Sequence, residues 1–162
     1  MSLMGITPKK IARSELSKYF AQQMQRINSA LLMELQNVGE MCVNHAREID
    51  ASSGFMDQTG NLRASIGYVI YANGKPIRSN FKDHQGPDGN NGEGKRSGEA
   101  LAKEVAGQYS KGLVLVVVAG MEYAHYVEAM NRDVLSSAEH LADKLVPSML
   151  KKLSKNINRM KL

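Results

Sequence analysis

The sequence predicts a single α+β domain, in which a long N-terminal helix and a C-terminal helix accompany a small, mainly antiparallel sheet of three or four strands. Three observations predict this class. Apolar residues recur at helical spacing over the first fifty residues, an Asn-Gly pair separates two strand-like segments, and helical spacing returns after residue 133. A chain of 162 residues suits one domain with a reasonable core. We expect the C-terminal helix to pack on the sheet.

The first element is a long helix that runs to Asp50. Thr7 can cap it, Pro8 suits its first turn, and Ser14 is a candidate position for a bend. Its apolar positions step by four, four and three residues, which is close to a straight helix stripe: Leu16, Phe20, Met24, Ile27, Leu31, Leu35, Val38, Cys42, Ala46 and Ile49. A helix of this length spans about 50 Å. It must therefore pack along another element or a partner.

The sheet begins with a hairpin. Residues 66–71 alternate in the way that indicates a strand. Asn73-Gly74 fits a type I′ turn, because both central residues of that turn need positive φ. We expect residues 75–77, or a little beyond, to form the returning strand. The apolar run at 113–120 is typical of a central strand covered on both faces, and we expect it to pair with the hairpin.

Residues 79–98 are polar and rich in glycine, so we expect a flexible loop there. A short helix follows over residues 98–109. Asp133 can cap the C-terminal helix, and Pro147 can kink it. The apolar stripe of this last helix consists of Leu135, Ala138, Leu141, Leu145, Met149 and Leu153.

The net charge of +5 arises at the C-terminus. The last twelve residues hold five cations and no acid: Lys151, Lys152, Lys155, Arg159 and Lys161. Two interpretations stay open. Residues 155–162 form a basic tail that contacts DNA or an acidic partner, or they are a solvated helix end stabilised by the helix dipole. Residues 1–6 resemble an added start and lie outside the predicted fold.

Cysteine use and hydropathy restrict the compartment. The single cysteine, Cys42, excludes an internal disulfide and a thiolate metal cluster, which fits a reducing compartment. No apolar run reaches the length that spans a membrane, and no signal peptide is visible. We therefore expect a protein made in the cytosol without a membrane partner.

The sequence contains no recognisable catalytic, metal or cofactor motif. His84, Asp83 and Asp88 lie on the glycine-rich segment, where they would bind a metal weakly. That segment also lacks the closing Glu of a calcium loop and the spacing of a phosphate loop. Glu122 and Glu128 are six residues apart and do not share one helix face. We expect no metal, no cofactor and no enzymatic activity, with an unrecognised hydrolase as an alternative.

Two stretches together resemble the tail-component family of long-tailed bacteriophages, which includes neck, head–tail joining and tail-completion proteins. They are T-G-N-L-R-A-S-I at 59–66 and A-G-M-E-Y-A-H-Y-V-E at 119–128. The resemblance covers about residues 15–155, with the elements in the same order, although Ala-Met-Asn follows Glu128 where the family often has Phe-Gly-Thr. The motif residues that it implies for folding and assembly are Gly60, Leu62, Arg63, Ser65, Ile66, Tyr123, Ala124, Tyr126 and Glu128.

The resemblance also suggests roles for these residues. We expect Gly60 to allow a tight turn before the first strand, and Leu62 and Ile66 to point into the core. Arg63 is expected to pair with Glu128. The two motif tyrosines are expected to close the sheet edge against the last helix. If the motifs serve the fold in this way, we expect the functional residues to lie on the surface of the protein.

The resemblance implies a virion structural protein, either a head–tail connector or a tail-completion component, without catalysis. Its partners would be copies of itself in a ring, neighbouring phage neck and tail proteins, and DNA bound without sequence preference. It would reside in the bacterial cytoplasm during assembly and then in the virion. The alternative is a basic DNA-binding module, which would lose duplex binding when residues 151–162 are removed.

Overall fold

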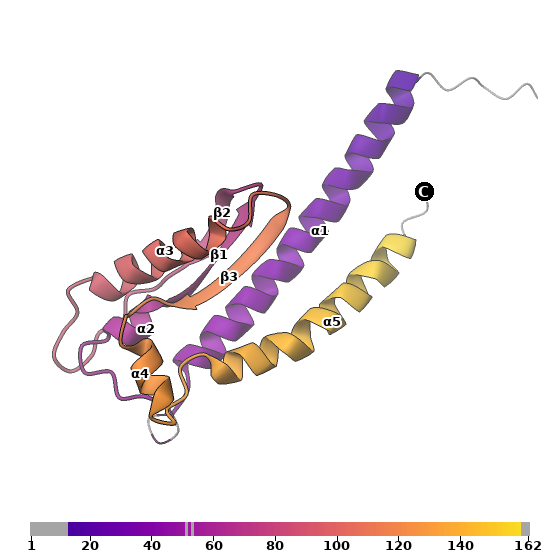
Figure 1. Ribbon diagram of the computed structural model, residues 1–162. Helices are drawn as coiled ribbons and strands as arrows, with labels where there is room; N and C mark the ends of the chain where they lie inside the picture. Colours follow the sequence, from indigo (N-terminus) through magenta and orange to yellow (C-terminus); the bar gives the residue numbers. More distant parts are fainter. Residues whose placement is uncertain (1–12, 51, 53, 160–162) are drawn as a thin grey trace, which may run out of the picture.

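The computed structural model describes residues 13–50, 52 and 54–159 and confirms the α+β class. The elements are α1 (Arg13–Arg47), α2 (Asn61–Ser65), β1 (Ile66–Ala72), β2 (Lys75–Asn80), α3 (Glu93–Ala106), β3 (Leu113–Ala119), α4 (Ala124–Ala129) and α5 (Ser136–Arg159). Helices α1 and α5 lie on one side of the sheet and α3 lies on the other (Figure 1). The predicted cap at Thr7 and Pro8, the start segment 1–6 and Lys161 lie outside the described residues.

The sheet is antiparallel, with the strand order β2-β1-β3. Asn73 and Gly74 have φ of 50° and 77°, so the predicted hairpin turn is confirmed. The apolar segment at 113–120 does pair with the hairpin, but its predicted central position is wrong, because β1 is central and β3 lies at an edge. Its continuous apolar pattern has another cause: helices cover both faces of β3 although one edge stays open.

The large apolar core lies between α1, α5 and the sheet. Its largest fully buried side chain is Tyr68, whose ring packs so closely on Gly39 that a Cβ there would lie 2.9 Å from the ring. The Tyr68 hydroxyl donates to Glu40 at 2.8 Å, and Asn80 donates to the same carboxylate at 2.7 Å. One acid of α1 therefore holds the central strand and an edge strand at once. Burial and this carboxylate raise the pKa of Tyr68 and keep the phenol protonated as a donor.

The predicted loop over 79–98 is shorter in the structure than in the prediction. Its first two residues belong to β2, and α3 begins at Glu93. Within the polar segment, Phe81 is buried and packs against Gly67 and Gly98. The Phe81 ring, packed against two glycines, and a hydrogen bond from the Asp88 N–H to the Gln58 carbonyl at 2.9 Å both anchor this connection, which sequence composition alone did not reveal.

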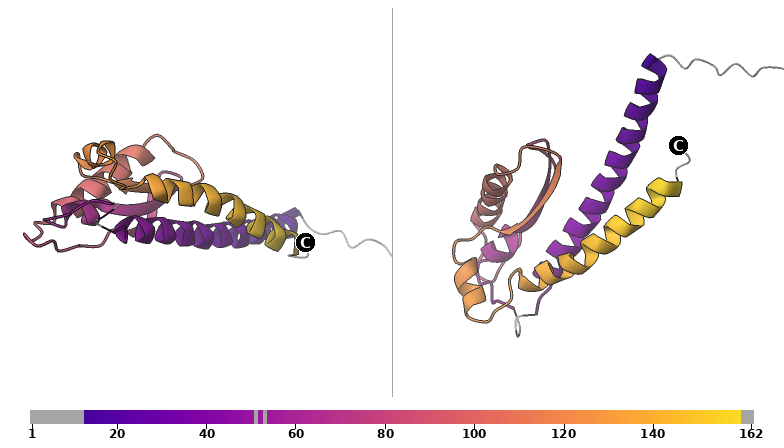
Figure 2. Two further views of the ribbon diagram at one scale, coloured as in Figure 1. Left: turned by 90° about the horizontal axis from the view of Figure 1, so that it is seen from below. Right: turned by 45° about the vertical axis from the view of Figure 1, so that its right-hand side comes forward.

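The C-terminal helix joins the core on the α1 side of the sheet and runs along α1. Pro147 lies inside α5 without ending it. Both helices continue past the sheet toward the same end of the molecule (Figure 2). We call residues 13–33 of α1 and 144–159 of α5 the arms. The predicted basic tail at 155–162 is therefore helical as far as Arg159, and α1 is unbroken at Ser14.

Candidate functional site

The two motifs that carry the family resemblance meet at Ser65. Its hydroxyl donates to the carbonyl of Leu62 at 2.8 Å and accepts the backbone N–H of Met121 at 3.3 Å. The Ser65 carbonyl accepts the N–H of Gly120 at 3.2 Å. Ser65 is fully buried, so these bonds replace water at a joint between segments that are 56 residues apart.

The first motif forms the short helix α2, and its last residue, Ile66, begins β1. Gly60 has φ of 80°, and a Cβ at this position would overlap the carbonyl oxygen of His84. Asp57 accepts the N–H of Arg63 at 2.7 Å and so satisfies a donor in the first turn of α2 that has no partner within the helix. Leu62 and Ile66 are fully buried, which confirms that both point into the core.

The predicted pairing of Arg63 with Glu128 is wrong. The Arg63 guanidinium donates to the carbonyls of Arg47 and Ile49, the second at 3.3 Å, and lies 5.1 Å from the centre of the Phe55 ring. The physical reason is that the last carbonyls of α1 have no partner within the helix and need donors from elsewhere. Arg63 supplies them, so its role here is to complete the end of α1.

Glu128 caps the C-terminal helix. Its carboxylate accepts the N–H groups of Leu135 and Ser136, each at 2.9 Å, and the Ser136 hydroxyl at 2.9 Å. Asp133 accepts the N–H of Ser137 at 3.2 Å, which confirms the predicted cap. The capping role of Glu128 was not predicted from the sequence. Burial raises the pKa of Glu128, but the hydrogen bonds together lower it by more than burial raises it. The pKa of Glu128 therefore lies below its ordinary value.

The two tyrosines of the second motif do not close the sheet edge. After β3 the chain turns into α4, where Ala124 is buried while Tyr123 and Tyr126 are 39% and 69% exposed. Tyr123 borders a polar hollow beside Thr59 and Glu93. Because α4 leads the chain away from the strands, the open edge of β3 is left uncovered by this motif.

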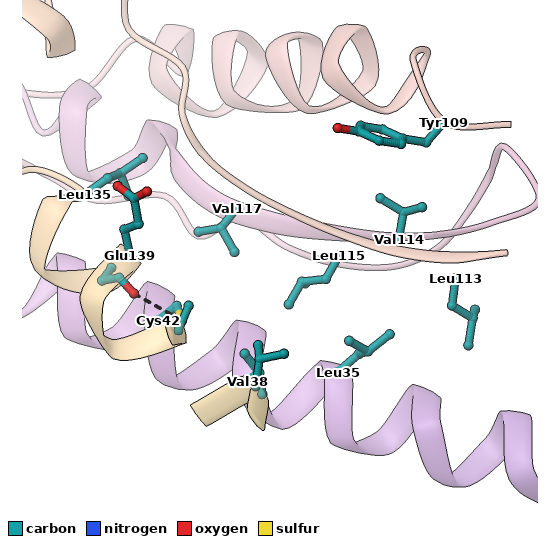
Figure 3. A pocket seen from close by; sticks show the side chains of 13 residues that line it. Leu35, Val38, Cys42, Tyr109, Leu113, Val114, Leu115, Val117, Leu135 and Glu139 are labelled. Carbon is teal, nitrogen blue, oxygen red and sulfur yellow. Dashed lines mark hydrogen bonds between the residues drawn. The ribbon is translucent and has the colours of Figure 1, made fainter. Parts of the chain in front are cut away.

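An apolar groove runs beside that open edge (Figure 3). We call it the β3 groove; its volume is about 630 Å³, and it is lined by Leu35, Val38, Cys42, Tyr109, Leu113, Val114, Leu115, Val117, Leu135, Ala138, Glu139, Ala142 and Val146. Of these described residues only Glu139 carries a charge. Among the described strands none pairs with the outer edge of β3. Sequence reasoning missed this groove, because the apolar run was assigned to a central strand.

A second apolar surface lies on the α1 arm. Leu16, Phe20 and Met24 are 45%, 56% and 55% exposed, and Tyr19 packs edge-to-face on Phe20 with ring centres 6.0 Å apart. We call these four residues the arm stripe. Contiguous exposed apolar residues of this size commonly mark interaction surfaces.

The predicted basic residues gather on one face of the α5 arm. Lys151, Lys152, Lys155 and Arg159 border one shallow hollow. Lys152 also makes an ion pair with Glu34 of α1 at 3.0 Å. This face therefore presents a group of cations, one of which already makes an ion pair within the chain.

The described residues offer little catalytic geometry. His45 Nε2 and Ser137 Oγ are 2.9 Å apart, the arrangement that the hydrolase alternative requires, but neither residue lines the β3 groove. Within the described ranges there is no group of three His, Cys, Asp or Glu that could hold a metal ion. No described helix is both long and apolar enough to cross a bilayer.

No family model, curated protein or solved structure matches the chain. Surfaces available for contact are therefore a guide to what the chain can bind. The part of the chain that the structure describes offers three of them: the arm stripe, the β3 groove and the cationic face of α5.

Proposed function

We propose that the chain is a structural protein of a phage or prophage virion, a head–tail connector or tail-completion component that acts through protein–protein assembly. The observation that supports this most is the joint between the two motifs, where Ser65 binds the backbone of Gly120 and Met121. The residues that carry the resemblance also hold distant segments of the chain together. The resemblance therefore concerns the whole fold and not a single short segment.

Assembly is the mode of action that suits these motifs. Most of their residues are buried or act as caps, so they are committed to folding and leave contact roles to other parts of the surface. The partners that we propose are copies of the same chain in a ring, together with neighbouring neck and tail proteins. The protein would accumulate in the bacterial cytoplasm during assembly and then reside at the head–tail junction or in the tail.

A role without catalysis is part of this proposal. The hydrolase alternative would depend on His45 and Ser137, which lie at the surface where α5 begins beside the end of α1. If this pair were a nucleophile and its base, the protein would hydrolyse an activated ester, and His45→Ala would remove the activity. We expect the rate with the unaltered protein to equal that of His45→Ala and of free imidazole at the same concentration.

Quantitative mass spectrometry of purified virions from an induced lysate tests the virion proposal. A ratio of a few to about a dozen copies per particle would support a closed ring in the neck. Hundreds of copies would instead indicate a tube or capsid component. Absence from well-formed particles would overturn the proposal and leave DNA binding as the leading function.

The cationic face of α5 favours DNA binding as a second candidate. Four cations around one hollow can meet successive phosphates of a duplex. In that case Lys151→Glu with Lys155→Glu would weaken binding and lower the salt slope by about 1 for each lost phosphate contact. The matched control is Lys75→Glu with Arg78→Glu, two exposed cations on β2. Equal losses in both double variants would indicate only a response to net charge.

A further inference from the structure

The arm stripe is an apolar surface without cover from the described residues of its own chain. The β3 groove is open along the edge of β3, although Val38, Cys42 and Ala138 in its lining are buried. The stripe continues the face of α1 that packs in the body through Leu31, Leu35 and Val38. Along that inner part the sheet and α5 lie over the face. Further out the face is exposed, because no residue in the described ranges covers it.

Charge is distributed unequally between the arms and the body. The α1 arm, residues 13–33, holds three Lys and Arg against one Glu, and the α5 arm, residues 144–159, holds five and no acid. Residues 34–143 hold fifteen Asp and Glu against ten Lys and Arg. Contact between the arms of two copies would bring like charges together. Contact between an arm and the body of another copy brings a net positive surface to a net negative one, which favours association and its orientation.

The groove has the chemistry to receive the arm. It is apolar except for Glu139, and Asp143 lies one turn further along the same helix. The arm offers cations beside its apolar residues, among them Arg26. Leu16, Phe20 and Met24 follow the i, i+4, i+8 spacing with which a helix anchors in an apolar groove. A volume of about 630 Å³ is within the range of protein pockets that bind drug-sized ligands, so the groove is large enough to admit apolar side chains.

We infer that the arm stripe of one copy docks in the β3 groove of a second copy. This inference deepens the proposed function, since it names the surface through which copies of the chain assemble. The contact joins two different surfaces, so each copy keeps a free arm or a free groove after pairing. Such a contact produces a ring when the rotation closes and an open filament when it does not.

Sedimentation velocity of the purified full chain over a range of concentrations tests the contact. We expect the unaltered protein to associate as its concentration rises. Phe20→Glu removes the central anchor of the arm, and we expect association at least about 30-fold weaker, the size of effect found for a buried aromatic anchor. Gln25→Glu adds the same charge on the opposite face of α1 and serves as the matched control, with association expected to be unchanged.

A mixing experiment separates this contact from an arm-to-arm dimer. Ala142→Arg blocks the groove, so we expect it by itself to associate as weakly as Phe20→Glu does. Mixed, the two variants should form a dimer and nothing larger, because the intact arm of Ala142→Arg fits the intact groove of Phe20→Glu. Glu139→Lys, at an exposed position, provides a second groove variant if Ala142→Arg melts at a lower temperature. It should weaken association, and Arg26→Glu in the other copy should restore it.

The results distinguish this inference from the proposed function. A protein that stays monomeric at every concentration overturns the inference, as does self-association of Ala142→Arg and Glu139→Lys at the level of the unaltered protein. Either result leaves the virion proposal intact if mass spectrometry finds the chain in particles. Self-association through the groove in a protein that is absent from virions would retain the contact and remove the proposed function.

Discussion

The two halves of the α1 stripe have the same spacing and opposite surroundings. Val38 and Cys42 in the inner half are 4% and 1% exposed, whereas Phe20 and Met24 in the outer half are 56% and 55% exposed. Nothing in the periodicity separates them. The difference arises because the sheet and the described part of α5 cover the inner half and do not cover the outer half. Apolar spacing thus predicts a helix face that must be buried, but it does not show whether the same chain or a partner buries it.

This comparison predicts that the halves contribute to different properties. The inner half belongs to the core, so changes there should lower the free energy of unfolding. The outer half should matter for association and little for the stability of the isolated chain.

Thiol chemistry should give the largest contrast along the helix. Cys42 is buried beside the Ala138 carbonyl, 3.7 Å from its sulfur, and burial raises the pKa of the thiol, so it should react with a thiol reagent only when the fold opens. A cysteine placed in the arm by Phe20→Cys should react faster by orders of magnitude. Spectroscopic detection of the released chromophore measures both rates in one chain. Equal rates would mean that the inner half is not covered in solution.

Truncation of the core should come next in size. Leu62 is fully buried in the same cluster as the inner half of α1, so Leu62→Ala should lower the free energy of unfolding by about 2–5 kcal/mol. Phe20→Ala in the arm should change it by less than about 0.5 kcal/mol. Urea denaturation at a concentration where the protein is monomeric measures both. A large loss with Phe20→Ala would show that the arm packs on its own chain.

The cap of α5 should contribute less, with a defined pH dependence. Glu128→Gln should cost about 1 kcal/mol near neutral pH, because it weakens the bonds that hold Leu135 and Ser136. The folded-state pKa of Glu128 lies below its ordinary value of 4.5, so its contribution is present above pH 4.5 and is lost as pH falls through the lower, folded-state pKa. Thermal melts of both proteins between pH 7 and acid measure this. A difference that is constant with pH would contradict the assignment.

The ion pair between the two helices should contribute least. Lys152 and Glu34 are 65% and 21% exposed at their side chains, so solvent and salt screen their attraction. A double-mutant cycle with Lys152→Ala and Glu34→Ala should give a coupling of about 0.2–1 kcal/mol that decreases with salt. A larger coupling would indicate that this pair decides how α5 lies along α1.

Sequence reasoning predicted the elements better than their neighbours. The hairpin followed from the backbone need of Asn73-Gly74, and both long helices followed from their apolar stripes. The edge position of β3 did not follow, because an apolar run records only that both faces are covered. The partner of Arg63 did not follow either, since the need that it meets belongs to the carbonyls at the end of α1.

The sequence by itself determined the class of this protein, its two long helices, its hairpin and the buried positions of Leu62 and Ile66, because these depend on local periodicity and on backbone restrictions that each residue carries with it. Only the tertiary structure decided that the two motifs meet at Ser65, that Glu128 caps α5, and that the arm stripe and the β3 groove stay open. These features depend on how segments distant in sequence come together, and a local pattern of residues contains no information about those contacts.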